Sequence, residues 1–344
     1  MAGEATGRPI RPDPACARQT GHMANVPGQV TVLCGGVGAA RFLTGAVQVI
    51  DPTQITAVVN TADDTVVNGL AISPDLDTVV YTLAGAIDAE RGWGLSGESW
   101  NTMELLDRYG AVRPGGSAAA TTWFSLGDRD IATHLYRTVR RAEGATLTAV
   151  TDEIRRAWDV GVHVLPMSDD PVASRLVLPG GEELAFQDYF VRLRHDVQIA
   201  GVRIDTSGAT PTAAVLAALD DADLVVIAPS NPLVSIQPLR ELPGVEERLA
   251  ARRRHVVAVS PIVGGRALKG PAERMLVELG HEPSVVGVAR LYAGIVAVLV
   301  IDPVDAHLAA DVENAGPRAL VTPSVMSSPA DAAALARATL SALG

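Results

Sequence analysis

A cluster of acidic residues lies in residues 59–79, "VNTADDTVVNGLAISPDLDTV", and the stretch contains no Lys and no Arg. Its four carboxylates are Asp63, Asp64, Asp75 and Asp77. Carboxylate oxygens suit Mg²⁺, which proteins usually hold with one or two carboxylates and the phosphates of a substrate. A carboxylate can also accept the proton of a substrate hydroxyl. Any one of these residues could instead be a helix cap or a turn residue. Since a cap needs a single acceptor, the cluster as a whole favours a site for a cation or for a reacting hydroxyl.

A glycine-rich loop precedes the acidic stretch. Gly35, Gly36 and Gly38 follow a short apolar run, and Arg41 comes after them. Glycines between a strand and a helix let backbone N–H groups approach a phosphate at the positive end of the helix. A dinucleotide fingerprint would need Gly or Ala in place of Arg41, and no Gly-Lys-Ser/Thr of a Walker loop follows. The loop predicts a phosphate site, with a plain tight turn as the alternative, and Arg41 could add a charged contact.

Two further loops carry polar or aromatic side chains. Ser230 and Asn231 stand between prolines in "APSNP", a rigid loop that suits a nucleobase edge or a ribose and equally suits an ordinary turn. Trp123 and Phe124 precede Ser125 in "WFSLGDRD", where two aromatic rings could cover a flat ligand or form the edge of the core. His134 follows on the next predicted helix, and we expect it to be structural.

The elements that position these loops alternate between strands and helices. Strands are predicted at 30–34, 55–59, 162–165, 224–228, 256–260 and 296–301. Helices are predicted between them, among others at 39–49, 77–87, 130–141 and 147–158, with a terminal helix at 332–343 capped by Asp331. Continuous apolar strands separated by helices predict an α/β fold: a Rossmann-like, mostly parallel sheet with helices on both faces. Residues from about 100 to 205 break this rhythm and predict an inserted helical and hairpin cap.

Composition limits the classes of function. A net charge of −11 without clustered Lys and Arg excludes nucleic-acid binding through a basic face. No stretch reaches the roughly 18 apolar residues of a membrane span. The two cysteines fit a reducing cytoplasm better than a disulfide scaffold. Residues 1–29 lack an apolar signal core and are expected to be a disordered N-terminal segment or a tag, followed by a single α/β domain at 30–344.

These segments together resemble the 2-phospho-L-lactate transferase family (CofD/FbiA). The matching stretches are "GGVGAARFL", "NTADD", "ISPDLDTVVYTLAG", "RGWGLSGESWN", "SLGDRDIATH", "LPMSDDPV", "FQDYFVR", "APSNPLVSI" and "VSPIVGGRALKGPAERM". They occur in this order from about residue 30 to residue 275, and the chain beyond carries the resemblance more weakly. Ala39 and Ala62 stand where many members have glycine, and neither change removes a proposed ligand.

The resemblance implies an enzyme of coenzyme F-420 biosynthesis, a transferase of substituted phosphate groups. It would join a phospho-three-carbon-acid group to the terminal hydroxyl of the deazaflavin Fo, giving F-420-0 or dehydro-F-420-0. The group would come from a guanosine-diphosphate-linked donor, with release of GMP and with Mg²⁺ as the cofactor. 2-Phospho-L-lactate, phosphoenolpyruvate and phosphoglycerate remain open as the acid. The resemblance further implies a cytoplasmic homodimer, a guanylyltransferase that makes the donor and a glutamate ligase that acts on the product.

The resemblance also implies roles for single residues. Gly35, Gly36 and Gly38 would hold the diphosphate, and Ser230 and Asn231 would meet the guanosine. Arg41 is assigned to the same phosphate site because of its place just after the loop. Asp77 and Ser125 fall where the family binds Fo. A flat deazaflavin could stack on an aromatic ring, and Trp123 or Trp100 could provide it. The residues predicted to bind Fo are therefore Asp77, Ser125, Trp123, Trp100 and Asn101, the last two in "GESWN". Asp77 could orient the hydroxyl or accept its proton, and Asp64 and Asp77 are assigned to the metal.

Two other classes of protein remain as alternatives. A YvcK-like nucleotide-sugar-binding regulatory protein would share the glycine loop and a similar acidic turn. The stretches "PDLDTVVYTL", "GESWN" and "SLGDRD" favour the transferase over it. An NAD(P)-binding oxidoreductase is disfavoured by Arg41 in place of the third glycine.

Overall fold

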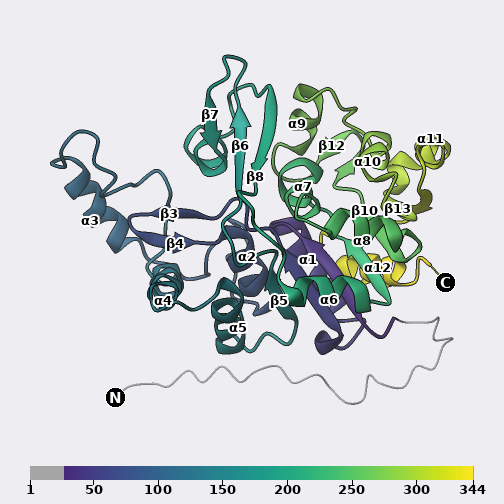
Figure 1. Ribbon diagram of the computed structural model, residues 1–344, viewed down its shortest axis with the longest axis horizontal. Helices are drawn as coiled ribbons and strands as arrows, with labels where there is room; N and C mark the ends of the chain where they lie inside the picture. Colours follow the sequence, from purple (N-terminus) through teal and green to yellow (C-terminus); the bar gives the residue numbers. More distant parts are fainter. Residues whose placement is uncertain (1–26, 344) are drawn as a thin grey trace.

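A seven-stranded parallel sheet forms the centre of the molecule. A computed structural model describes residues 27–343 of the chain (Figure 1). The strand order is β14-β13-β10-β9-β1-β2-β5, and every neighbouring pair is parallel. The strands are β1 (Val30–Cys34), β2 (Ile55–Val59), β5 (His163–Pro166), β9 (Leu224–Ile227), β10 (Val256–Val259), β13 (Val298–Ile301) and β14 (Arg318–Val321). The expected Rossmann-like α/β fold is thereby confirmed. Most of the segment predicted to be disordered, 1–29, lies outside the described residues.

The inner strands are apolar throughout because both faces of the sheet are covered. All residues of β1, β9, β10 and β13 are buried. Successive residues of one strand point to opposite faces and join two separate cores. Leu33 and Val225 belong to one core, whereas Val32 and Val226 belong to the other. This two-sided burial is what the continuous apolar runs predicted.

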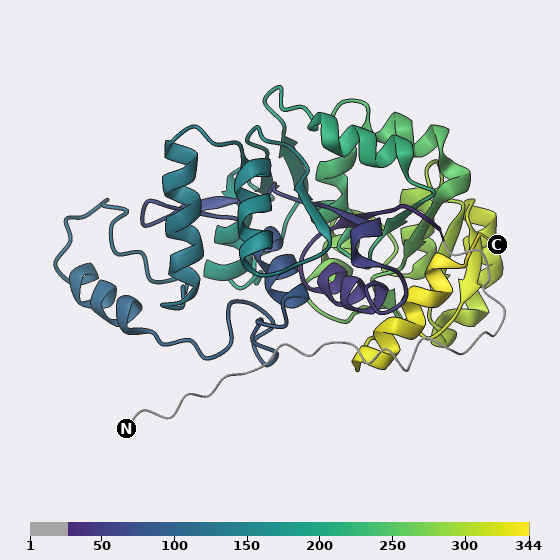
Figure 2. The ribbon, with the colours of Figure 1, turned by 90° about the horizontal axis from the view of Figure 1, so that it is seen from below.

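Helices cover each face of the sheet. The face of Val32 packs against α1 (Val37–Ala46), α2 (Pro74–Leu83), α5 (Leu147–Ala157) and α12 (Pro329–Leu340), and α1 contacts both α2 and α12. Figure 2 shows α1 (purple) and α12 (yellow) side by side, with the green helices across the sheet. The helices of the other face and its edge are α6 (Ala213–Asp221), α7 (Gln237–Arg240), α8 (Val245–Ala251), α9 (Ala272–Glu278), α10 (Val285–Tyr292) and α11 (Ala309–Ala315).

The terminal helix starts earlier than predicted. Its N-cap is Ser328, whose side chain accepts a hydrogen bond from the backbone N–H of Asp331, and Pro329 occupies the first turn. The prediction that Asp331 caps the helix was therefore wrong. A Ser followed by Pro is an equally good start signal, because Pro suits the first helical position.

The segment predicted as one inserted cap returns to the central sheet. Within 100–205, α3 (Asn101–Gly110) and α4 (Asp130–Ala142) extend to one side in Figure 1, and a three-stranded sheet of β7 (Glu183–Ala185), β6 (Ala173–Val177) and β8 (Gly201–Asp205) rises above the fold. Between them, β5 pairs in parallel with β2. The cap is therefore not one continuous insertion. No helix within residues 27–343 is long and apolar enough to cross a membrane.

Two short hairpins complete the fold. One, β11 (Ile262–Val263) with β12 (Arg266–Ala267), follows β10. The other, β3 (Thr65–Val67) with β4 (Leu70–Ile72), lies inside the acidic stretch. Its turn residues Asn68 and Gly69 have φ of 52° and 83°, as a two-residue Asn-Gly hairpin turn requires. The hairpin reverses the chain, so that Asp63 and Asp64 before it lie close to the segment of Asp75 and Asp77 after it.

Candidate active site

The strand order reverses at β1, and the glycine loop lies at this point. From β1 the chain continues to β2 on one side and later returns to β9 on the other. Ligands of open α/β sheets bind outside the carboxyl ends of the strands at such a switch point. The loops that follow β1 and β9 contact each other here, because the N–H of Gly35 donates to Oγ of Ser230 at 3.0 Å. The structure therefore brings together two of the predicted loops.

Close packing explains the loop glycines. A Cβ on Gly38 would stand 2.1 Å from the carbonyl oxygen of Pro229, and one on Gly35 would stand 2.5 Å from Cβ of Ser235. A Cβ on Gly36 would stand 2.5 Å from Oδ1 of Asp75. Gly36 is also the N-cap of α1, and no side chain caps that helix start. The loop is thus pressed against its neighbours while the first N–H groups of α1 remain available to an anion.

The acidic stretch lies directly beside this loop. Asn60, the first residue after β2, donates from Nδ2 to Oδ1 of Asp63 at 3.2 Å and to Oδ2 of Asp75 at 3.1 Å. Its own Oδ1 accepts from the N–H of Ala62 at 3.0 Å. One amide side chain therefore holds a carboxylate from each half of the stretch and places Asp75 next to Gly36.

Burial makes these carboxylates difficult to ionise. Burial raises the pKa of Asp64 to about 8 and that of Asp75 to about 6. Burial, followed by the charges of Asp75 and Asp64, raises the pKa of Asp63 well above its usual range. A hydrogen bond from Ser73 to Oδ2 of Asp64, at 2.7 Å, only partly offsets the burial. A bound cation would favour the ionised forms.

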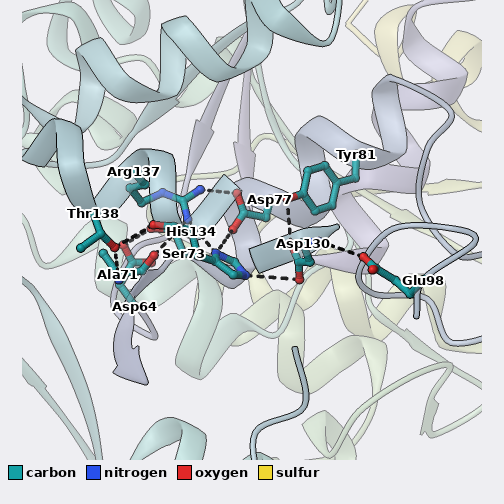
Figure 3. A network of polar contacts seen from close by, with 10 residues as sticks. All are labelled: Asp64, Ala71, Ser73, Asp77, Tyr81, Glu98, Asp130, His134, Arg137 and Thr138. Atoms are coloured by element: carbon teal, nitrogen blue, oxygen red, sulfur yellow. Dashed lines mark hydrogen bonds and ion pairs between the residues drawn. The ribbon is translucent and has the colours of Figure 1, made fainter. Parts of the chain in front are cut away.

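The cation that the stretch itself lacks comes from α4. Arg137 of that helix donates from Nη2 to Oδ1 of Asp77, and both side chains are buried (Figure 3). Nη1 of Arg137 donates to the carbonyl oxygen of Ala71 at 3.3 Å. Despite burial, the charge of Asp77 raises the pKa of Arg137, so the guanidinium stays charged. Sequence reasoning missed this residue, and it changes the reading of the acidic stretch as a cluster without a cation.

His134 extends the buried network. Its Nε2 lies 3.3 Å from Oδ2 of Asp130, one helical turn earlier, and its Nδ1 lies 3.6 Å from Oδ2 of Asp77. Tyr81 of α2 donates its hydroxyl hydrogen to Oδ1 of Asp130 at 2.7 Å. The histidine is thus buried between a carboxylate of α2 and one of its own helix, and the structural role expected for it stays a prediction.

Two carboxylate oxygens in this network are buried and form no hydrogen bond with any residue of 27–343: Oδ1 of Asp64 and Oδ2 of Asp77. Nδ1 of His134 lies 3.6 Å from that oxygen of Asp77. Among residues 27–343 there is no group of three or more His, Cys, Asp or Glu arranged to hold a metal ion. An ion bound by protein side chains alone does not fit this arrangement. Mg²⁺ held by one or two carboxylates and completed by substrate phosphates does fit it.

Asn231 has a structural task in the loop after β9. Its Oδ1 accepts from the N–H of Leu233 at 3.0 Å and caps the turn Pro232–Ile236, while its Nδ2 lies 3.4 Å from Sδ of Met275. Ser230 is buried against the glycine loop. Arg41 is exposed on α1.

A cavity of about 600 Å³ lies beside the β3–β4 turn. Its walls are Val66, Val67, Asn68, Gly69, Leu106, Ala118, Ala119, Ala120, Thr121 and Trp123. Trp123 is the aromatic residue of this lining, and its ring lies edge-on to Phe124 with centroids 5.9 Å apart. The cavity is thus mainly apolar, with one large aromatic wall.

The other predicted acceptor residues are placed differently. Trp100 packs edge-on against Trp93, with centroids 6.2 Å apart, and Arg91 lies over both rings. Asn101 donates from Nδ2 to Oδ2 of Asp128 at 2.9 Å, at the start of α3. Neither residue is part of the cavity lining.

Ser125 is exposed and follows Trp123 by two residues. Of the predicted acceptor-site residues, the structure therefore brings Trp123 to a cavity and places Asp77 in the buried acidic network.

Comparison with known proteins identifies the family. The family model "2-phospho-L-lactate transferase CofD" matches residues 30–322. A phosphoenolpyruvate transferase of Streptomyces griseus is 42% identical over 317 residues, which is 91% of this chain and 97% of that protein. The chain belongs to the CofD family. The phosphoenolpyruvate transferases of Thermobifida fusca and Nocardia farcinica are 40% and 37% identical, over 90% and 92% of this chain and 96% and 95% of theirs.

A solved structure supports the fold of this CofD-family protein. A UPF0052-family protein from Bacillus halodurans superposes with a TM-score of 0.56 at 16% identity, over 91% of this chain and 98% of the other. With the family shown, the chain is a transferase of a phosphoacid group in F-420 biosynthesis. This finding favours the transferase prediction over the regulatory protein and the oxidoreductase.

Proposed function

We propose that this CofD-family protein transfers the phosphoenolpyruvyl group from a guanosine-diphosphate-linked donor to the terminal hydroxyl of Fo. The hydroxyl oxygen attacks the phosphorus that carries the three-carbon acid, and the bond from that phosphorus to the bridging oxygen breaks. GMP leaves with the bridging oxygen, the hydroxyl proton passes to a base, and dehydro-F-420-0 forms. The choice of acid is supported by relatives named phosphoenolpyruvate transferase at 37–42% identity over most of the chain. 2-Phospho-L-lactate, giving F-420-0, is the alternative acid.

One observation carries the proposal: the acidic cluster lies against the glycine loop at the switch point of the sheet. Oδ1 of Asp75 occupies the space that a side chain at Gly36 would need. A diphosphate bound at the start of α1 would therefore lie beside carboxylates. Phosphoryl transfer depends mainly on positioning and on neutralising phosphate charge, so this juxtaposition suits it.

Mg²⁺ is the proposed cofactor. Asp64 would hold it with its buried Oδ1, which forms no hydrogen bond within residues 27–343, and Asp77 is the second proposed ligand. When bound, the ion would neutralise charge on the diphosphate. The raised pKa of Asp64 supports this assignment, since an uncompensated buried carboxylate is costly and a divalent cation would relieve it.

Asp77 is proposed to orient the acceptor hydroxyl and to accept its proton. Arg137 fixes Oδ1 of Asp77, so Oδ2 points in a defined direction. That second oxygen accepts no hydrogen bond within residues 27–343, and Nδ1 of His134 lies 3.6 Å from it. A carboxylate held by one oxygen and without a hydrogen bond at the other is suited to receive a proton from a bound alcohol.

The ring system of Fo is proposed to bind in the cavity beside Trp123. A tricyclic deazaflavin has a large flat face, and the cavity offers apolar walls and one aromatic ring. The β3–β4 hairpin forms part of the cavity wall and is continuous in sequence with Asp64 on one side and Ser73 on the other. The ring and the reacting hydroxyl would thus bind to parts of one segment.

The remaining partners are proposed from the family. A guanylyltransferase would supply the donor, a glutamate ligase would extend the product, and two copies of the chain would form a homodimer. Analytical ultracentrifugation tests the last point directly.

Product analysis tests the proposed reaction. The purified protein is incubated with Fo, Mg²⁺ and each guanylated acid in turn, and the products are identified by mass spectrometry. We expect dehydro-F-420-0 and an equal amount of GMP from the enolpyruvyl donor, at a higher rate than from the lactyl or glyceryl donors. A preference for the lactyl donor would change the acid, and the absence of product with every donor would contradict the proposed function.

A further inference from the structure

The stretch "FQDYFVR" forms an unusual turn between β7 and β8. Residues Asp188–Arg192 are a single π-helical turn, a rare conformation that occurs frequently at functional sites. The chain leaves this turn through Arg194 and His195, which have φ of 50° and 46° although neither is glycine. Such left-handed residues cost free energy and persist where the surrounding structure imposes them. The contacts of the turn with its neighbours therefore indicate what it does.

One end of the turn is fixed to the acidic stretch. Gln187, just before the turn, is buried and donates from Nε2 to the carbonyl oxygen of Asp63 at 3.1 Å. The same small sheet makes a second connection, because the N–H of Ser174 in β6 donates to the carbonyl oxygen of Ala62 at 2.7 Å. The three-stranded sheet is thus hydrogen-bonded to the segment that carries two of the clustered aspartates.

The other end of the turn reaches Trp123. Cζ of Arg192 lies over the indole ring, 6.0 Å from its centroid. A cation at about this distance is attracted by the electron-rich face of the ring. Nε of Arg192 lies 3.1 Å from Oδ1 of Asp188, one turn earlier, and this ion pair directs the guanidinium. Trp123 comes from the segment between α3 and α4, so the contact joins two projections of the fold that are separate in Figure 1.

Arg192 contacts the indole without entering the cavity. Trp123 belongs to the cavity lining, whereas Arg192 and Phe124 do not. The ring of Phe124 stands at 83° to the indole, with centroids 5.9 Å apart. A guanidinium and a phenyl ring thus support the indole and leave the cavity unoccupied by their own atoms.

We propose that Arg192 is a positioning residue for the acceptor, because it holds the indole of Trp123 at the angle at which the ring of Fo stacks on it. The inference rests on the proposed function and deepens it by adding a residue that determines how the acceptor is recognised. Through Gln187, the same turn is hydrogen-bonded to the acidic stretch. The turn therefore sets the separation between the aromatic wall and the carboxylates, which has to match the distance between the ring of Fo and its terminal hydroxyl.

Replacing Arg192 with Met tests the contact, because Met keeps an unbranched side chain and removes the cation. Fo is fluorescent, so its affinity is measured by fluorescence titration, and that of GDP by calorimetry. We expect Fo to bind roughly three- to tenfold more weakly and GDP to bind unchanged. The KM for Fo should rise by a similar factor while kcat at saturating Fo stays the same, because Arg192 does not touch the reacting atoms. Arg192→Lys should recover part of the loss, since it keeps a cation over the ring.

Arg203→Met is the matched control. Arg203 is an exposed arginine on β8 of the same small sheet, and it pairs with Glu183 at 2.7 Å as Arg192 pairs with Asp188. This change removes an arginine and an ion pair from the sheet without touching Trp123. Fo should therefore bind to Arg203→Met as tightly as to the wild type.

A double-mutant cycle tests whether Arg192 acts through Trp123. Arg192→Met introduced into Trp123→Ala should cause no further loss of Fo affinity, since the ring that it positions is gone. Additive losses would show that Arg192 acts independently of Trp123 and would overturn the inference. Parallel losses for Fo and GDP in Arg192→Met would also overturn it, because they indicate general destabilisation.

The outcomes separate this inference from the proposed function. If the wild type binds Fo and forms product, but Arg192→Met binds Fo as tightly as Arg203→Met, the proposed function stands and the positioning role is overturned. If the wild type does not bind Fo, the proposed acceptor is wrong and the positioning role is rejected with it.

Discussion

Arg137 of α4 donates a hydrogen bond to Asp77 of α2, and the two side chains form a buried ion pair across 60 residues of sequence. The pair joins α2, which carries two of the four clustered aspartates, to α4, which begins at Asp130 within the stretch "DRDIATH". The second oxygen of Asp77 accepts no hydrogen bond within residues 27–343 and lies 3.6 Å from Nδ1 of His134. The pair therefore anchors and orients the carboxylate of Asp77, which is proposed to accept the proton of the acceptor hydroxyl.

Replacing Asp77 with Asn should lower kcat by roughly two to four orders of magnitude, because the amide cannot accept the hydroxyl proton. Rates are measured over a range of Mg²⁺ concentrations with saturating Fo. A loss that persists at high Mg²⁺ indicates proton transfer, whereas recovery at high Mg²⁺ indicates that Asp77 mainly binds the metal. Asp311→Asn, an exposed change on α11, is the control. A rate for Asp77→Asn equal to that of this control would make Asp77 purely structural.

Replacing Arg137 with Met should destabilise the fold, since Asp77 would keep a buried charge without its cation. Removing one partner of a buried pair typically costs about 3–5 kcal/mol. Urea unfolding of the wild type, Arg137→Met, Asp77→Asn and the double variant measures the coupling between the two residues. We expect the double variant to be more stable than the sum of the single changes implies. Additive losses would show that the pair is not energetically coupled.

The ligand-free protein should lose stability as the pH rises from about 6 to 8. Burial raises the folded-state pKa of Asp64 to about 8, above its unfolded value of 3.8. Between these values the folded state binds more protons than the unfolded state, so stability decreases with rising pH. The carboxyls of Asp128 and Glu153, with lowered pKa values, are ionised in both states over this window and do not contribute.

Thermal unfolding at several pH values checks this, with Asp64→Asn as the matched variant. The variant should show a weaker pH dependence between pH 6 and 8, because its side chain does not titrate. Saturating Mg²⁺ should also flatten the wild-type curve, since metal binding favours the ionised carboxylate. If wild type and variant follow parallel curves, the raised pKa of Asp64 is refuted.

Replacing Trp123 with Ala should weaken the binding of Fo while leaving that of GDP unchanged. Stacking on an aromatic ring contributes about 0.5–1.5 kcal/mol beyond the buried area. Trp123 lines the cavity, whereas the glycine loop and Ser230 form a different region. Titrations with Fo and with GDP separate the two effects, and Trp100→Ala serves as the comparison. Equal losses for both ligands would mean that Trp123 supports the fold instead.

The inner strands were predictable because their chemistry is local. Residues 30–34 and 55–59 are continuous β-branched and apolar runs, and the structure has β1 and β2 at those positions. The edge strand β14, Arg318–Val321, was missed because its side chains are only partly buried and the run is not distinctly apolar. The β3–β4 hairpin was also missed, although Asn68-Gly69 is a recognised turn signal.

The partners within the site were not predictable from spacing. His134 and Arg137 follow Asp130 by one and two helical turns, which places all three on one helix face. The position of Asp77 opposite that face could not be predicted from the sequence. The contact joins two helices, so it depends on how the helices pack. Asn231 shows the opposite case. Its amide side chain suits a ligand contact, yet in the structure that side chain caps the following turn.

The fate of the acceptor oxygen tests the central claim most directly. Fo labelled with oxygen-18 at its terminal hydroxyl is converted with the enolpyruvyl guanosine-diphosphate donor and Mg²⁺. The oxygen-18 content of both products is then measured by mass spectrometry. Attack of the hydroxyl on the acid-bearing phosphorus predicts that the label is retained in dehydro-F-420-0 and that GMP is unlabelled. Label found in GMP, or an unlabelled deazaflavin product, would contradict the proposed transfer.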